Sequence, residues 1–123
     1  MSVRRRIGVD EGIAAVDAVL AGTDDRPTTA TAVRYLLEQL ADEAEGHTVE
    51  VRVPPFGAVQ AIDGPRHTRG TPPNVVEMDA ATWIALATGA LDWDAAVADL
   101  RVTASGARAT LAEQLPLRWA PGR

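Results

Sequence analysis

The sequence lacks cysteine and lysine altogether. Without cysteine there can be no disulfide, no thiolate nucleophile and no cysteine-ligated metal site. All twelve basic residues are arginine, and the formal net charge is -5. An acidic chain has no excess of positive charge to set against a phosphate backbone, so we expect no nucleic-acid partner.

Long apolar runs are also missing. No window approaches the roughly 18 uncharged residues that a membrane-spanning helix needs. The first residues carry the charge of a signal peptide, but Asp10, Glu11 and Asp17 interrupt the apolar core that such a peptide requires. We therefore expect a cytoplasmic protein without stable membrane insertion.

Catalytic motifs are absent from the sequence as well. There is no Gly-x-Ser-x-Gly elbow, no phosphate-binding glycine loop and no dinucleotide fingerprint. The two histidines, His47 and His67, do not have metal-binding spacing. Asp63, Asp79 and Asp92 each precede a turn or helix, where capping of backbone N–H groups explains a carboxylate. The sequence thus predicts no enzyme, no metal and no cofactor.

What the chain does have is small apolar residues. Hydrophobic residues make up 46% of the 123 positions, but aromatic residues only 4%. A chain of this length can bury roughly two-thirds of its surface in one core, so we expect residues 1–123 to form a single domain. Small side chains leave room between elements, which suits an internal cavity as well as close helix packing.

Helical spacing of apolar residues predicts two helices near the start of the chain. The first covers residues 10–21. The second begins at Thr28 or Thr29, either of which can cap it, and ends at Gly46. We expect this N-terminal pair, residues 10–46, to dock on a sheet because neither helix is long enough to bury its apolar stripe alone.

After Gly46 the spacing of apolar residues changes from the helical period of 3.6 residues to the strand period of 2. Valines alternate with polar residues over 48–53, and an extended segment at 56–62 can pair with them as an antiparallel hairpin. Residues 63–74 are polar and rich in proline, which predicts a surface loop. The later elements predicted are a strand at 75–78, helices capped by Asp79 and Asp92, a strand in which Leu100, Val102 and Ala104 alternate with polar residues, and a last helix ending near Leu115 and Pro116.

This order of elements predicts an α/β (α+β) fold. We expect a small twisted sheet of about four to five mostly antiparallel strands covered by helices, spanning residues 47–118. The two N-terminal helices precede it.

Residues 48–117 resemble the sterol carrier protein family in element order and spacing, and residues 10–46 resemble the leading helices of its bacterial members. The positions that match family features are Val75 to Met78, Asp79, Trp83, Leu86, Gly89, Ala96, Val102, Ala104 and Gly106. Leu100 departs from the pattern, because many relatives have glycine there. We expect this difference to alter the backbone approach and the cavity.

The resemblance implies a fold around an apolar tunnel that binds a hydrophobic ligand, such as a fatty acid, an acyl conjugate or a sterol-like lipid, without covalent chemistry. The residues expected to line it are Phe56, Val59, Trp83, Leu86, Leu91, Trp93, Val97, Val102, Leu111 and Leu115. The competing interpretation is that these side chains fill the core completely. Trp83 and Trp93 can equally flank a cavity mouth or close the core.

Arg66, His67 and Arg69 lie together in the polar loop and could hold an anionic head group, since arginine binds such groups bidentately. A solvated loop explains them as well. Trp119, near the end of the chain, could cover the sheet or contact a partner.

An alternative function is an accessory or protein-interaction domain whose tunnel has collapsed and which binds no ligand. Such a domain would act through an exposed sheet edge or through the Trp119 tail. A homodimer is compatible with either function.

Overall fold

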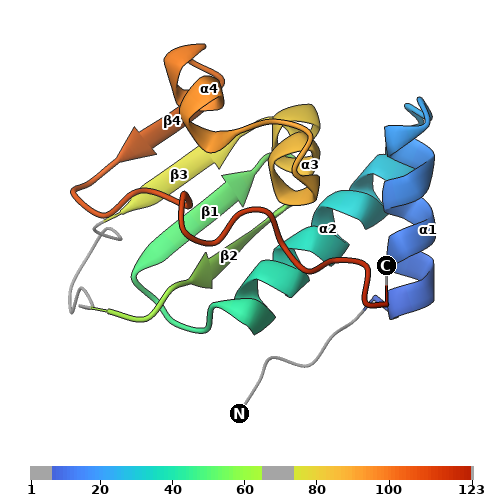
Figure 1. Ribbon diagram of the computed structural model, residues 1–123, viewed down its shortest axis with the longest axis horizontal. Coiled ribbons are helices and arrows are strands. Elements are labelled where there is room, and N and C mark those ends of the chain that lie inside the picture. Colours follow the sequence, from blue (N-terminus) through green and yellow to red (C-terminus); the bar gives the residue numbers. More distant parts are fainter. Residues whose placement is uncertain (1–6, 65–73, 123) are drawn as a thin grey trace.

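The computed structural model describes residues 7–64 and 74–122 (Figure 1). In these residues four helices and four strands follow one another in the order predicted from the sequence up to residue 105. They are α1 (Val9–Leu20), α2 (Arg26–Glu43), β1 (Val49–Val53), β2 (Gly57–Ala61), β3 (Val75–Met78), α3 (Ala80–Thr88), α4 (Trp93–Ala98) and β4 (Val102–Ser105).

The strands form one mixed sheet in the order β2-β1-β3-β4. The β1–β2 and β3–β4 pairs are antiparallel, and the central β1–β3 pair is parallel. The predicted α+β class and the predicted hairpin at 56–62 are therefore confirmed. In β1 the alternation has its expected effect: Val49, Val51 and Val53 are buried, while Glu50 and Arg52 point to the other face.

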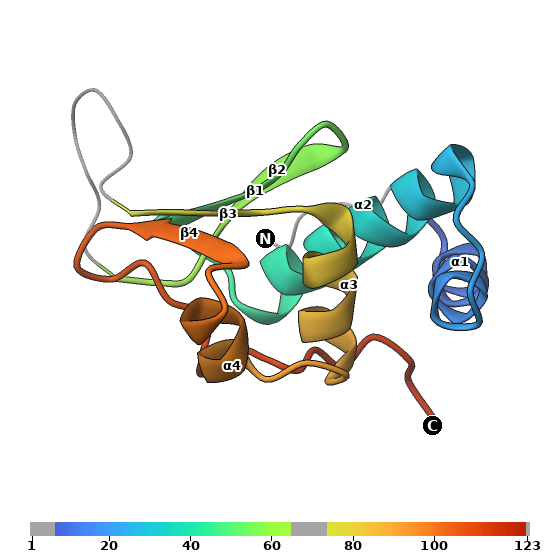
Figure 2. The same ribbon diagram turned by 90° about the horizontal axis from the view of Figure 1, so that it is seen from above.

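The sheet is covered by helices on one face (Figure 2). Helices α2, α3 and α4, together with the chain after β4, lie on that side. The opposite face carries polar side chains, among them Arg52, whose guanidinium forms an ion pair with Glu50 at 2.9 Å. Hydrogen bonding to Glu50 raises the pKa of Arg52, and the charge of Glu77 on β3 adds to this.

The core lies between the sheet and the buried faces of α2 and α3. The predicted apolar stripe of α2 is buried, and the valines of β1 face it. The largest fully buried side chains here are Trp83, Tyr35, Leu36, Leu40, Leu86 and Leu111. Burial of this apolar surface is the main favourable contribution to folding.

Aspartate side chains cap three of the helices. Asp79 accepts a hydrogen bond from the Thr82 backbone N–H at 2.8 Å, and Asp92 caps α4 in the same way, as predicted. The hydrogen bond with Thr82 lowers the pKa of Asp79. For α2 the prediction of a threonine cap is wrong, because Asp25 is the cap and accepts from the Thr28 N–H, three residues before Thr28. Proline is tolerated in a first helical turn, so Pro27 does not delay the start.

Helix α1 does not reach the sheet. It packs on α2, which lies between α1 and the strands (Figure 2). The prediction that both N-terminal helices dock on the sheet is therefore correct only for α2. The close approach of α1 depends on Gly12, since a Cβ there would lie 2.1 Å from the ring of Tyr35.

The predicted last helix is absent: residues 106–122 form turns and irregular chain. The Thr110 hydroxyl accepts the Ala112 N–H at 3.1 Å, which favours a local turn over a helical bond. Farther along, Pro116 disfavours helical geometry at Leu115. An apolar spacing of this length was not enough to specify a helix.

Leu100 and Ala104 are exposed, so the predicted burial of the last strand fails at both positions. Strand β4 begins at Val102, which is buried, whereas Ala104 on the same face of the strand is exposed. Leu100 follows α4 with a φ of 59° and is 88% exposed. Its side chain therefore points to solvent rather than into a cavity.

The backbone of Leu100 explains why glycine suits this position. A left-handed conformation costs an L-residue roughly 1–2 kcal/mol, and glycine avoids most of that cost while losing about 0.5–1 kcal/mol of chain entropy. We expect Leu100→Gly to raise the free energy of unfolding by about 0.5–1 kcal/mol, measured by urea denaturation. Ala98→Gly, two residues earlier in α4, should instead lower it by about 1 kcal/mol. A loss of stability in Leu100→Gly would contradict this account.

Candidate apolar binding site

A half-open cavity of about 190 Å³ lies where the α3–α4 connection meets the C-terminal chain. We call it the apolar cavity because, apart from Asp92, the side chains that line it are apolar. We call residues 109–119 the strap, because they cross the helical side of the molecule without regular structure (Figure 1). The cavity is lined by Leu86, Gly89, Leu91, Asp92, Trp93, Ala112, Leu115 and Pro116.

Local structure fixes one wall of this cavity. Leu86 projects from the buried face of α3, and Gly89 ends that helix with a φ of 87°, as its sequence position predicted. The chain then turns back, and the Leu91 N–H donates to the Ala85 carbonyl at 3.1 Å. Capping of α4 by Asp92 places Trp93 at the start of the helix, with its ring almost fully buried.

The strap forms the other wall and is fastened mainly beyond the cavity. The Leu117 N–H donates to the Ala87 carbonyl of α3 at 2.9 Å. The Arg118 N–H donates to Oε2 of Glu43 on α2 at 2.7 Å, and the Gln39 side chain donates to the Arg118 carbonyl at 3.0 Å. These bonds tie the end of the strap to both helices.

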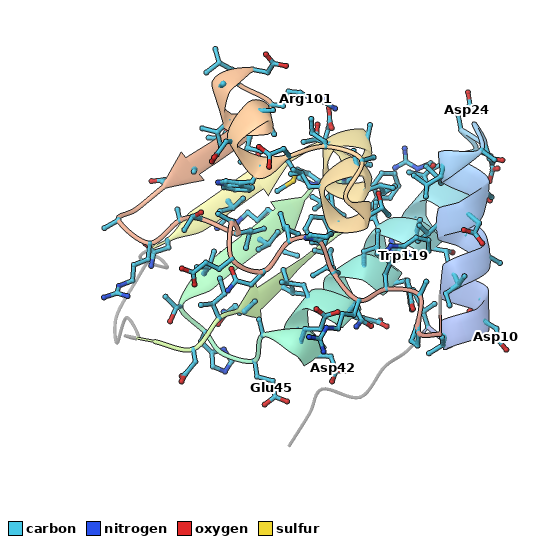
Figure 3. All side chains as sticks on the ribbon, viewed as in Figure 1. Asp10, Asp24, Asp42, Glu45, Arg101 and Trp119 are labelled. Carbon is cyan, nitrogen blue, oxygen red and sulfur yellow. The ribbon has the colours of Figure 1, made fainter. Side chains whose placement is uncertain are left out.

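Trp119 belongs to the same fastening. Its carbonyl accepts a hydrogen bond from the hydroxyl of Tyr35, a fully buried side chain of α2, and its ring is half-buried against the core. Figure 3 places it beside α2, where the strap runs toward α1. Within the described residues Trp119 therefore packs on the helices and does not cover the sheet.

A second, polar cavity of about 450 Å³ lies between the strap and the end of α2. Pro116 lines both cavities. The remaining lining residues of the second cavity are Glu43, Ala44, Glu113, Gln114 and Arg118.

Four of the residues predicted to line a tunnel meet around the apolar cavity: Leu86, Leu91, Trp93 and Leu115. The others lie elsewhere. Trp83, Leu111 and Val102 are buried in the core, Val97 is exposed on the outside of α4, and Phe56 and Val59 lie at the β2 edge. Phe56 lies under the Arg26 guanidinium, 5.4 Å from its ring centre. Arg66, His67 and Arg69 fall outside the described residues.

The part of the lining that has small or polar side chains was not predicted from the sequence. Gly89 and Asp92 were recognised only as helix signals, and Ala112 and Pro116 only as parts of a helix that does not form. A search for large apolar side chains finds one wall of a cavity. It does not find the small residues that leave the space open.

The chemistry available at the site is limited. Among the described residues no three His, Cys, Asp or Glu side chains gather as a metal site would require. None of the helices in the described ranges is long and apolar enough to cross a membrane. The apolar cavity has one carboxylate in its lining, Asp92, and that group is engaged in capping α4.

A comparison with known protein families identifies a relationship for this chain. The family model described as bacterial SCP ortholog, where SCP denotes sterol carrier protein, matches residues 25–117. This range includes both walls of the apolar cavity and omits α1. No curated protein matches the chain. Because the family model covers well over half of the sequence, the chain belongs to the family of bacterial orthologues of sterol carrier protein.

Proposed function

We propose that this protein binds the apolar part of a hydrophobic ligand in the cavity between the α3–α4 connection and the strap, and performs no covalent chemistry on it. The observation that carries the proposal is the cavity itself, whose lining includes Leu86, Leu91, Trp93 and Leu115. Family membership supports the same function, since lipid binding or transfer is the theme of sterol carrier proteins. Binding would draw on the transfer of ligand carbons out of water, worth about 0.8 kcal/mol per methylene.

The size of the cavity sets a condition on binding. Pockets for drug-sized ligands begin at roughly 300 Å³, and this cavity has about 190 Å³. A longer chain therefore requires the strap to move outward. Several of the strap's side chains are exposed, and its backbone bonds at residues 110–115 are local, so its displacement costs less than opening the core.

Filling the cavity should abolish binding. Ala112 lies at the exposed rim, so Ala112→Trp places an indole at the entrance without disturbing the core. We expect the affinity of the Ala112→Trp variant for dodecanol to be at least about tenfold lower than that of the parent protein, the equivalent of about 1.4 kcal/mol. Isothermal titration calorimetry measures this difference.

Ala90→Trp is the matched control. Ala90 is exposed in the α3–α4 connection and does not line the cavity, so this variant should bind dodecanol as the parent protein does. Absence of saturable dodecanol binding by the parent protein would refute the proposed function. Equal binding by the parent protein and Ala112→Trp would place the site elsewhere.

A further inference from the structure

The apolar cavity has a buried side-chain donor in its wall. Trp93 lines the cavity and is 9% exposed. Within residues 7–64 and 74–122 its indole N–H donates to no carbonyl and no side chain, whereas the indole N–H of Trp83 donates to the Val33 carbonyl at 3.3 Å. Buried donors in proteins are nearly always hydrogen-bonded, so the N–H of Trp93 lacks a partner that a ligand can supply.

Other donors around the cavity are already engaged. The backbone N–H groups of Gly89 and Leu91 donate to carbonyls of α3, and that of Ala112 donates to the Thr110 hydroxyl. Among the lining side chains only Trp93 carries a donor, because the other seven residues are leucine, alanine, glycine, proline or aspartate. The indole N–H is therefore the side-chain group through which this lining can recognise an acceptor.

We infer that the ligand is an uncharged amphiphile whose carbonyl or hydroxyl oxygen accepts a hydrogen bond from the Trp93 indole N–H. The inference rests on the proposed function and adds the polar group that the site selects. A pure hydrocarbon chain that filled the cavity would exclude water from this N–H and leave it without an acceptor, which weakens binding. A ligand oxygen at the same place satisfies the donor.

The lining disfavours a charged oxygen at this position. Asp92, the neighbour of Trp93 in the chain, supplies the one charged side chain among the lining residues, and no arginine is among them. Its carboxylate is held in place by the N–H groups of Asp94 at 3.1 Å and Ala95 at 3.3 Å. A fatty-acid carboxylate bound at Trp93 would meet this like charge without a neutralising partner in the lining.

The first test measures the affinities of the parent protein and of Trp93→Phe for dodecanol, 2-dodecanone and dodecanethiol by isothermal titration calorimetry. Phenylalanine keeps an aromatic ring in the wall and removes the N–H. Sulfur is a weak acceptor, so dodecanethiol reports the apolar contribution. We expect Trp93→Phe to lower the affinity for an oxygen probe about fivefold to tenfold more than the affinity for dodecanethiol. The probe with the larger loss distinguishes a carbonyl from a hydroxyl.

Trp83→Phe is the matched control for this substitution. Trp83 donates to Val33 inside the core and does not line the cavity. The control should therefore change the affinities for all three probes by the same factor.

Nuclear magnetic resonance provides a direct measurement on the parent protein. The indole N–H signals of the three tryptophans can be assigned with Trp93→Phe and Trp83→Phe. The better-bound oxygen probe should move the Trp93 indole proton downfield by more than dodecanethiol does, because only the oxygen accepts a strong hydrogen bond. The Trp83 signal should stay in place.

The failures of the two proposals are distinguishable. If the probes bind saturably but Trp93→Phe lowers all three affinities equally, without an additional downfield shift for the oxygen probes, the recognition by Trp93 is wrong and the proposed function stands. Laurate that binds as tightly as 2-dodecanone would overturn the uncharged ligand class. If none of the four probes binds saturably, the proposed function itself fails.

Discussion

Replacing Trp83 with alanine is expected to lower the free energy of unfolding by about 3–5 kcal/mol. Trp83 is fully buried on α3 and belongs to the main core cluster. Its indole N–H donates to the Val33 carbonyl of α2 at 3.3 Å, so the side chain links the two helices that cover the sheet. Removal of the ring would leave a cavity that the surrounding strands and helices cannot fill. Urea denaturation followed by circular dichroism measures the loss.

Trp83→Phe is the matched variant, because it keeps an aromatic ring and removes the hydrogen bond to Val33. We expect Trp83→Phe to lower the free energy of unfolding by about 1–2 kcal/mol, the range of one buried hydrogen bond plus a small loss of side-chain volume. The comparison also decides between the two interpretations of Trp83. If Trp83 lined an open ligand cavity, its truncation would lower the free energy of unfolding only slightly and would enlarge the space for the ligand. A loss below about 1 kcal/mol in Trp83→Ala, with tighter dodecanol binding, would contradict its assignment to the core.

The second large effect is expected at Gly12. Intrinsic helix propensity alone predicts that Gly12→Ala stabilises α1 by about 1 kcal/mol. The structure predicts the opposite sign, because the new Cβ would lie 2.1–2.6 Å from three ring atoms of Tyr35. Tyr35 is fully buried and its hydroxyl is bonded to the Trp119 carbonyl, so its ring has no room to move. We expect a net loss of about 2 kcal/mol, within the usual range for overpacking.

Gly8→Ala is the control for this experiment. Apart from its chain neighbours, no atom is found within 4 Å of a Cβ at Gly8. Gly8→Ala should therefore lower the free energy of unfolding by no more than about 1 kcal/mol, the cost of alanine in place of glycine at the N-cap of α1. Because α1 packs on α2 and lies outside the range matched by the family model, Gly12→Ala should also expose α1 to limited proteolysis. Dodecanol binding should persist, since the cavity is built from other elements. Increased stability in Gly12→Ala would show that α1 does not pack as described.

The sequence specified most of the local structure. Alternating valines defined β1 through residues 49–53, and a carboxylate followed by a regular apolar spacing defined the starts of α3 and α4 at Asp79 and Asp92. Gly89 ended α3 as expected. These signals depend on interactions within a few residues, so a single sequence is enough to detect them.

Predictions failed in two segments after α4, one held by distant contacts and the other set by the way in which α4 ends. Residues 106–115 have a helix-like apolar spacing, yet the chain there is held by the Asn74 side chain at Arg108 and by burial of Leu111. Leu100 continues a strand pattern in the sequence, but the end of α4 places its backbone at positive φ. In residues 106–115 tertiary packing overrode a weak local propensity, whereas at Leu100 the local hydrogen bonds that end α4 determined the backbone.

The candidate site, too, was determined partly by the sequence and partly by the tertiary structure. The sequence, through its apolar positions and its resemblance to sterol carrier proteins, determined the fold class and selected Leu86, Leu91, Trp93 and Leu115 among ten lining candidates. Only the tertiary structure decided that these four meet while Trp83 and Leu111 fill the core. It also decided that Pro116 lines a polar cavity beside them. The physical reason is that burial is recorded in the sequence as hydrophobicity, whereas empty space depends on how distant segments pack against one another.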